Sequence, residues 1–318
     1  MKTIKRSFII LMTILGLSCS NDDGPVNVAP TVSTQSFNAN EGVLDTDVLG
    51  KVVAQDPDGD TLNYSITTNS DNLFEISTTG DLSLILGKTL DYEVSTSHTL
   101  TVEVSDGALK ANSIITINVI NDNEAPVVAP QNFSIDENSA SGVLIGTLVA
   151  SDPDGDSLVF SIIGSSFPFE INNSGEISLA VNSTLNFEQK SSYTLEIVTS
   201  DNNLQTSTDI IININDVNDA PNIGTTVFTV AEDIDDTFAI GGIPTSDEDR
   251  DTLIFSLGDT FASRDFEISS LGIISLKAGS SLDYETNTFH NFPVRVSDGT
   301  ITISRQVTVY VTDVDDTP

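Results

Sequence analysis

The sequence is poor in several residue types on which common protein chemistries depend. Its 318 residues include one cysteine, two histidines and no tryptophan. One cysteine excludes a disulfide within the chain, so the domains must be held by their cores and by whatever their polar groups bind. Two histidines, His98 and His290, offer no imidazole beside a nucleophile or soft ligands, which argues against a catalytic triad or a histidine-based zinc site.

Basic residues are also scarce. Twelve lysines and arginines face 47 aspartates and glutamates, for a formal net charge of −35. Such a chain cannot neutralise phosphates, so nucleic acid is excluded as a partner, and the implied partner is a cation. Hydrophobic residues still make up 38% of the chain. The acids therefore decorate folded domains rather than a disordered tail.

The N-terminal residues predict export. Three cations precede an apolar run from residue 8 to residue 17, which is the layout of a secretory signal over residues 1–18 and is too short for a membrane span. Cys19 follows Leu17 and Ser18 and resembles the cysteine of a bacterial lipobox. We expect lipid attachment at Cys19, a flexible tether over residues 19–29, and a location at the outer membrane or cell surface. The alternative is an incidental cysteine in an uncleaved leader.

Two acidic patterns recur at steps of 95 to 97 residues. Asp56-Pro57-Asp58-Gly59-Asp60 returns at 152–156 and, altered, at 247–251. Leu90-Asp91-Tyr92-Glu93 returns at 185–188 and 282–285. Acidic segments with a proline separate the copies. Such self-similarity indicates tandem repeats, which we place at residues 30–122, 126–219 and 221–318.

The fold class expected for each repeat is all-β. Runs over residues 99–104, 114–120, 209–215 and 306–312 alternate or combine Ile, Val and Thr between polar turn clusters. No stretch keeps helical spacing over three turns. Several short strands within about 95 residues predict an antiparallel, Greek-key, immunoglobulin-like β-sandwich. Three such sandwiches in tandem would form a linear rod.

These motifs resemble the cadherin family over about 290 of the 318 residues. Each repeat has an early acid, an Asp-x-Asp motif or its variant, a Leu-Asp-x-Glu motif or its variant, a later lone aspartate and an acidic linker, in this order. The early acids are Glu41, Glu137 and Glu232. The resemblance implies Ca²⁺ binding at the joints between repeats and a role in adhesion.

Calcium suits these residues because it takes six to eight oxygens, and no single loop here supplies them. Loops gathered at the facing ends of two sandwiches could do so. An EF-hand is excluded, since glycine falls at the fourth position of Asp-Pro-Asp-Gly-Asp and Thr67 stands at the twelfth. A single Asp-Pro-Asp-Gly-Asp is also an ordinary turn sequence. Acidic residues placed on the surface by chance, however, would not recur at a fixed spacing along the sequence.

The resemblance assigns two metal-binding joints. The first comprises Glu41, Asp91, Glu93, Asn121, Asn123, Glu124, Asp152, Asp154 and Asp201. The second comprises Glu137, Asn186, Glu188, Asp216, Asn218, Asp219, Asp247, Asp249 and Asp298. Each set holds seven carboxylates, which repel one another strongly unless a cation joins them. Asn121 and Asn186 stand where the family has aspartate, which leaves the number of ions per joint open.

The expected function is therefore that of a calcium-rigidified adhesion protein at the cell surface, not an enzyme. The expected partners are calcium and another copy of the chain, a cell-surface protein or a glycan, with membrane contact only through the lipid. Two alternatives stay open: a passive stalk that presents a module beyond the C-terminus, and a carbohydrate-binding module. His98 and His290 occupy equivalent positions, where the middle repeat has Tyr193, and we interpret them as structural residues.

Overall fold

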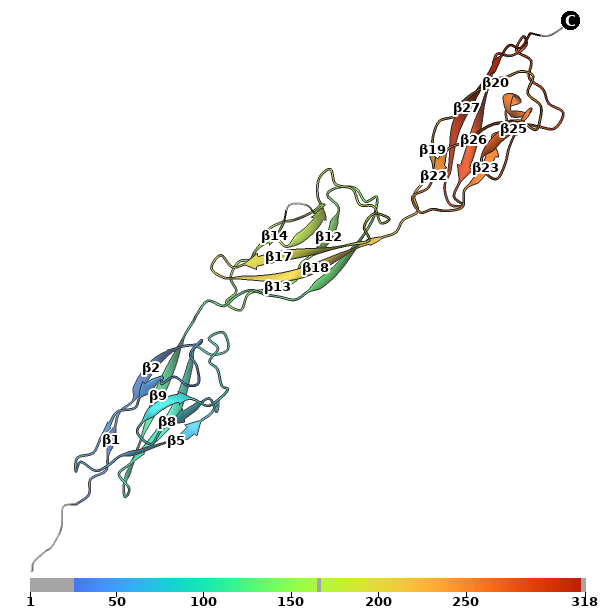
Figure 1. Ribbon diagram of the computed structural model, residues 1–318. Helices are drawn as coiled ribbons and strands as arrows, with labels where there is room; N and C mark the ends of the chain where they lie inside the picture. Colours follow the sequence, from blue (N-terminus) through green and yellow to red (C-terminus); the bar gives the residue numbers. More distant parts are fainter. Residues whose placement is uncertain (1–25, 165–166, 316–318) are drawn as a thin grey trace, which may run out of the picture. The chain divides into compact units, whose positions relative to one another are not determined.

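The computed structural model describes residues 26–164 and 167–315 and consists of three β-sandwich repeats (Figure 1). The predicted signal and Cys19 lie outside the described residues. The chain divides into two compact units, the first ending at Glu124 and the second beginning at Ala125 and containing the second and third repeats. The described residues form no α-helix, and no helix among them is long and apolar enough to cross a membrane. The all-β prediction is confirmed.

The first repeat contains three sheets. A four-stranded sheet has the order β2-β9-β8-β5 and a three-stranded sheet the order β3-β7-β6, while β1 pairs with β4. The strands are β1 (Thr31–Val32), β2 (Gln35–Asn40), β3 (Gly50–Lys51), β4 (Ala54–Gln55), β5 (Asn63–Asn69), β6 (Phe74–Ile76), β7 (Asp81–Leu84), β8 (Ser97–Ser105) and β9 (Lys110–Ile120).

The second repeat has the same plan. Its sheets have the orders β11-β18-β17-β14, β12-β16-β15 and β10-β13. The strands are β10 (Val127–Val128), β11 (Gln131–Asp136), β12 (Leu144–Thr147), β13 (Ala150–Ser151), β14 (Val159–Ile162), β15 (Phe169–Ile171), β16 (Glu176–Leu179), β17 (Ser192–Ser200) and β18 (Gln205–Asn215).

The third repeat keeps this plan and adds one short 3-10 helix. Its sheets have the orders β20-β27-β26-β23, β21-β25-β24 and β19-β22. The elements are β19 (Asn222–Ile223), β20 (Val227–Ala231), β21 (Ala239–Gly242), β22 (Thr245–Ser246), β23 (Ile254–Leu257), η1 (Phe261–Ser263), β24 (Phe266–Ile268), β25 (Ile273–Leu276), β26 (Phe289–Ser297) and β27 (Thr302–Thr312).

Each core lies between the four-stranded and three-stranded sheets. In the first repeat, Leu82 and Leu84 from β7 pack with Leu100 from β8 and with Ile115 and Ile117 from β9, all nearly inaccessible to water. Alternate residues of β8 and β9 are buried, as the period of a strand requires when one face meets the core. Burial of each such side chain stabilises the fold by about 2 kcal/mol.

One strand pair in each repeat runs parallel. β2 pairs with β9, β11 with β18, and β20 with β27 in this way, while the other ladders are antiparallel. The chain reaches β2 after β1 has paired with β4, so it changes sheets at residues 33 and 34. This change brings the N-terminal end of the repeat beside its last strand.

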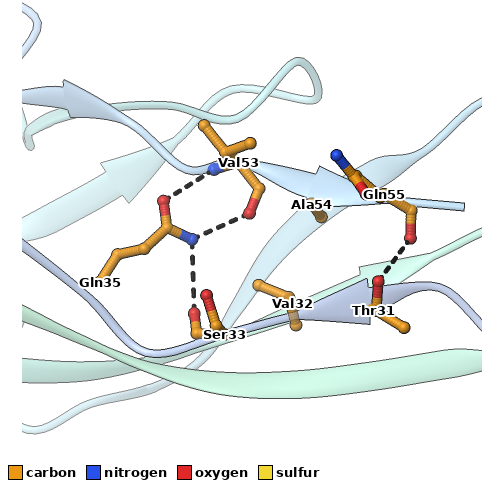
Figure 2. A pocket seen from close by; sticks show the side chains of 7 residues that line it. All are labelled: Thr31, Val32, Ser33, Gln35, Val53, Ala54 and Gln55. Carbon is orange, nitrogen blue, oxygen red and sulfur yellow. Dashed lines mark hydrogen bonds between the residues drawn. The ribbon is translucent and has the colours of Figure 1, made fainter.

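Gln35 stabilises the change of sheets in the first repeat (Figure 2). Its amide oxygen accepts a hydrogen bond from the Val53 N–H at 2.9 Å, and its amide nitrogen donates to the Val53 carbonyl at 2.9 Å. Gln131 makes the same two bonds to Val149 in the second repeat. The hollow beside Gln35 in Figure 2 is lined by no titratable side chain. It has the character of a sheet edge and not of a catalytic cleft.

A glycine admits an aromatic ring at the same place in each repeat. A Cβ atom on Gly50, Gly146 or Gly241 would lie 2.2 to 2.3 Å from a ring carbon of the phenylalanine that packs against it. In the third repeat this ring belongs to Phe228. Side chains do not reach so close without displacement, so the ring and the strand would both have to shift.

We predict that Gly241→Ala destabilises the third repeat by about 1–3 kcal/mol, because it overpacks the core against Phe228. The matched control is Gly242→Ala, since a Cβ atom there meets nothing within 4 Å. Thermal or urea unfolding of the two variants measures the difference. Equal stabilities of Gly241→Ala and Gly242→Ala would contradict this packing.

Candidate metal centres

A glutamate organises the lower end of each repeat, which is the end from which the next linker leaves, and it is buried in the first two repeats and half-buried in the third. Glu41 is 7% exposed, and its two carboxylate oxygens accept hydrogen bonds from the backbone N–H groups of Tyr92, at 2.7 Å, and Asp122, at 2.8 Å. One bond holds the Leu-Asp-x-Glu loop and the other holds the linker. Two N–H donors offset the cost of burying the charge.

The same arrangement recurs in the other repeats. Glu137, 2% exposed, accepts from Phe187 N–H at 2.7 Å and Val217 N–H at 2.9 Å. Glu232 accepts from Tyr284 N–H at 2.7 Å and Val314 N–H at 2.9 Å. The early acid is therefore both a candidate ligand and the residue that fixes the loops of the other ligands.

Carboxylates converge at each lower end. In three groups, one oxygen from each member lies within 4.8 Å of the others. The groups are Glu41 with Asp91 and Glu93, Glu137 with Glu188 and Asp216, and Glu232 with Asp283 and Glu285. The first two consist of residues that the sequence assigned to the two joints. The third is the lower half-site of the last repeat.

The Asp-x-Asp loop closes on its first aspartate at the upper end of each repeat. The Asp152 Oδ1 atom accepts from the Asp156 N–H at 3.2 Å, and the Asp247 Oδ1 atom accepts from the Asp251 N–H at 3.1 Å. This turn needs a left-handed residue at its fourth position. Gly155 supplies it with φ of 79°, whereas Arg250 adopts φ of 66° in the altered third copy.

The second oxygen of that aspartate is buried without a donor in all three repeats. Asp56 Oδ2, Asp152 Oδ2 and Asp247 Oδ2 are inaccessible to water and receive no hydrogen bond. A buried carboxylate oxygen without a donor is costly. A cation at this position would satisfy it.

The late aspartate adds a third oxygen source at the upper end. Asp201 is 4% exposed, and its Oδ1 atom accepts from the N–H groups of Asn203 and Leu204, both at 2.6 Å. Asp298 Oδ1 accepts from Thr300 and Ile301 in the same way. One oxygen is thereby fixed by the turn, which orients the other.

The second linker contacts the upper end of the third repeat directly. The Asn218 amide donates to Asp298 Oδ2 at 2.9 Å, and the Asp219 N–H donates to Asp249 Oδ2 at 2.6 Å. The Asn186 amide also donates to Glu248. Within the second compact unit, the structure therefore brings together residues of the loop, linker and Asp-x-Asp motifs that the sequence assigned to one joint.

The residues that the sequence assigned to the first joint come from both compact units. Glu41, Asp91 and Glu93 converge with the linker start at Asp122 in the first unit. Asp152 and Asp154 form the Asp-x-Asp loop in the second unit, and Asp201 closes its own turn there. The assigned linker residues, Asn121, Asn123 and Glu124, end the first unit.

The chain ahead of the first repeat binds its upper end as a linker would. The Asn27 amide donates to Asp106 Oδ2 at 3.0 Å, and the Val28 N–H donates to Asp58 Oδ2 at 2.7 Å. These bonds match those made by Asn218 and Asp219 in the second linker. The sequence assigned no partner to this half-site. Asn27 is such a partner, but Val28 stands where the second linker has Asp219.

Like charges raise the pKa of two carboxyl groups at the second joint. Loss of solvation, followed by the charges of Asp249 and Glu137, raises the pKa of Asp216. The Glu188 backbone N–H lowers the pKa of its own carboxyl group, but desolvation and the charges of Glu137 and Asp249 outweigh it, so the net shift is upward. No salt bridge within the described residues neutralises either group.

Hydrogen bonds have the opposite effect on Asp298. The amide of Asn218 is the largest influence, and with the N–H groups of Ile301 and Thr300 it lowers the pKa of this carboxyl group. Asp298 is therefore held as a carboxylate by its neighbours, while Asp216 and Glu188 resist ionisation beside theirs.

Glu248 is a candidate ligand that the sequence reasoning missed. One of its oxygens lies within 4.8 Å of oxygens of Glu188 and Asp219. It occupies the middle position of Asp247-Glu248-Asp249, where the other repeats have Pro57 and Pro153. The available signal was this exchange of proline for an acid in the altered third motif.

The histidines take structural positions. His98 is buried, contacts the Phe74 ring edge-on at a centroid distance of 5.6 Å, and pairs with Asp71 through Nδ1 at 2.6 Å. His290 packs against Phe266 in the same way, and burial lowers the pKa of its imidazole. Neither belongs to the carboxylate clusters found among the described residues.

The donor set fits a hard, oxygen-loving cation. The converging groups are carboxylates, and no histidine or cysteine joins them among the described residues. Calcium takes such ligands in flexible geometry and larger numbers than magnesium does. It would satisfy the buried aspartate oxygens and offset the repulsion around Asp216.

Comparison with known proteins identifies the same repeats. The family model of the cadherin domain matches residues 35–120 and 131–215, together more than half of the chain. Protocadherin gamma-A4 of Pan troglodytes is 31% identical over 221 residues, which are 64% of this chain and 23% of that protein. Cadherin-5 of Danio rerio is 29% identical over 284 residues, 77% of this chain and 36% of that protein. The chain thus spans about a quarter to a third of these relatives.

Solved structures show the same fold. Mouse cadherin-23 EC22-24 aligns with a TM-score of 0.63 at 21% identity, over 91% of this chain and all of that chain. Protocadherin gamma B2 extracellular cadherin domains 1-5 align with a TM-score of 0.63 at 21% identity, over 90% of this chain and 60% of that chain. With its matched motifs, repeated sandwiches and converging acids, the chain belongs to the cadherin family.

Proposed function

We propose that this chain is a calcium-binding adhesion protein of the cell surface, in which calcium rigidifies the joints between repeats. The observation that carries the proposal is the buried Oδ2 atom of Asp56, Asp152 and Asp247, which lacks a donor in every repeat. Family membership supports it, because cadherin repeats are adhesion domains that bind calcium in general.

The joints follow from the geometry of the clusters. When bound, calcium would supply positive charge shared by carboxylates on both sides of a linker. Glu137 fixes the lower loops through two N–H donors, and Asp298 and Asp249 hold the linker from above. With the ion in place, a linker between two such ends loses its freedom to bend. Affinity is expected at about 10⁻⁴ to 10⁻³ M, as for other extracellular calcium modules.

The proposal includes a location outside the cytoplasm. It rests on the secretory pattern of residues 1–18 and the lipobox resemblance at Cys19, both outside the described residues. Mass spectrometry of the N-terminus of the exported protein tests it, since cleavage before Cys19 with an acylated cysteine is expected.

Calcium titration combined with small-angle X-ray scattering tests the central proposal. We expect heat of binding and a fall in the flexibility of the chain over the same calcium range. Bead aggregation separates an adhesion protein from a passive stalk, because a stalk stiffens without joining beads. If calcium stiffens the chain but the beads do not aggregate, the calcium-binding part of the proposal stands, and the chain acts as a passive stalk instead of an adhesion protein.

Glu188→Ala is predicted to weaken calcium binding at the second joint by at least about tenfold and to increase bending there, because it removes a converging carboxylate. Glu196→Ala is the matched control, since it removes an exposed glutamate of the same repeat from β17. Calorimetry and scattering on both variants measure the effects. Identical calcium titrations of the two variants would show that Glu188 is not a calcium ligand.

Asn186→Asp is predicted to tighten calcium binding at the second joint severalfold. It adds a carboxylate beside Glu248, with which the Asn186 amide now forms a hydrogen bond. The same change should lower the melting temperature of the calcium-free protein, because two acids then face each other. Calorimetry with and without EDTA checks both directions, and a lower calcium affinity would contradict the assignment.

The carboxyl groups of Asp216 and Asp298 are predicted to titrate on opposite sides of the usual aspartate pKa. A raised pKa means that Asp216 stabilises the calcium-free fold at low pH and that this contribution is lost as pH rises through the raised value. A lowered pKa means that Asp298 contributes at higher pH and loses this as pH falls through the lowered value. Carbon-detected NMR titration measures both. Calcium should move the Asp216 midpoint downward, and an unmoved midpoint would contradict its role as a ligand.

A further inference from the structure

The third repeat differs from the other two on the outer face of its four-stranded sheet. Phe289 on β26 pairs across the strands with Tyr310 on β27. The equivalent cross-strand pairs are polar in the first two repeats: Ser97 with Asn118, and Ser192 with Asn213. One position has thus changed from two small polar residues to two aromatic rings, within a register that is otherwise the same.

A neighbouring position has changed in the same direction. Val227 on β20 lies beside Thr308 of β27, diagonal to Tyr310. Its equivalents are Ser36 in the first repeat and Asn132 in the second. We call Val227, Phe289 and Tyr310 the aromatic face.

The aromatic face is open to solvent. Phe289 and Val227 are each 54% exposed and Tyr310 is 48% exposed. Isolated exposed apolar residues are ordinary, but contiguous large ones on one face mark interaction sites. The two rings are 6.3 Å apart and inclined by 48°. They do not form one flat platform for a sugar chain, so the face suits a protein partner better than a glycan.

The charges of this face are unlike those of the same face in the second repeat. The outward residues of the described strands β20, β23, β26 and β27 include one cation, Arg295, and no carboxylate. The corresponding face of the second repeat carries Asp136, Glu196 and Asp209. Aromatic residues and arginine are enriched in protein interfaces, and acids are depleted.

We propose that the aromatic face is a contact surface for a second copy of this chain, formed by the same face on both copies. Two chains of net charge −35 repel each other. Two copies that meet through this face place no carboxylates opposite one another. The same face of the second repeat would contribute three carboxylates from each copy. An apolar patch also complements itself, which is what a two-fold contact requires.

The size of the face sets the strength of the contact. Nine residues of β26 at about 3.4 Å each, and four strands about 4.8 Å apart, give a face of roughly 500–600 Å². Two copies would bury roughly 1,000–1,200 Å² in total, which is typical of weak or transient interfaces. The contact is therefore a weak one, suited to many copies acting together on one surface. It deepens the adhesion part of the proposed function and rests on it, but it does not depend on the calcium sites.

Analytical ultracentrifugation of the exported chain, from micromolar to millimolar concentration, tests the proposal. The test variant is Phe289→Ser with Tyr310→Asn, which installs the residues of the first two repeats and so keeps the fold. The control is Phe261→Ser, which removes an 80% exposed phenylalanine of the same repeat from η1. We expect the wild type and the control to dimerise, and the dissociation constant of the double variant to rise at least tenfold.

Salt provides a second readout. Association of two like-charged copies through a face without carboxylates should strengthen between low and high ionic strength, because salt screens their repulsion. A wild type that stays monomeric at every concentration, or a double variant that dimerises as well as the wild type, would overturn the proposal. Selective binding of a neutral oligosaccharide to the wild type without dimerisation would also overturn it. Calcium titration of the same samples separates these failures from failure of the calcium sites.

Discussion

The glutamate at the lower end of each repeat, buried in the first two repeats and half-buried in the third, is the constraint on which the rest of the site depends. Glu41, Glu137 and Glu232 spend both oxygens on backbone N–H groups, one in the loop and one in the linker. Those bonds bring the exposed carboxylates together although they repel one another. The sandwich holds the loops rigidly, and the glutamate holds the loops that carry the carboxylates together. The uncompensated negative charge then favours the binding of a cation.

The sequence was sufficient for the fold class and for most of the candidate ligands, because both depend on patterns that repeat. Alternation of apolar residues predicted the strands, and a fixed step between acidic motifs indicated that Glu93 and Glu188 occupy equivalent positions in different repeats. The parallel pairing of β2 with β9 was not predicted, since strand alternation says nothing of direction and the change of sheets depends on contacts such as those of Gln35 with Val53.

Departures from the repeat were harder to predict than the repeat itself. Glu248 stands where the other copies have proline, so a search for the common motif passes over it. The docking of Asn27 onto Asp106 depends on a fold that brings together residues 79 positions apart. The aromatic face was also missed, because exposure and register, which separate a core phenylalanine from an outward one, are properties of the folded sheet.

The parallel pair beside the N-terminal end has a mechanical consequence. β2 and β9 lie side by side and point the same way, so tension applied through the two ends of a repeat pulls one strand past the other. The hydrogen bonds between the two strands are then loaded in shear and must break together, instead of breaking one after another. Each sandwich is thus built to resist extension along the chain, independently of what holds its neighbours.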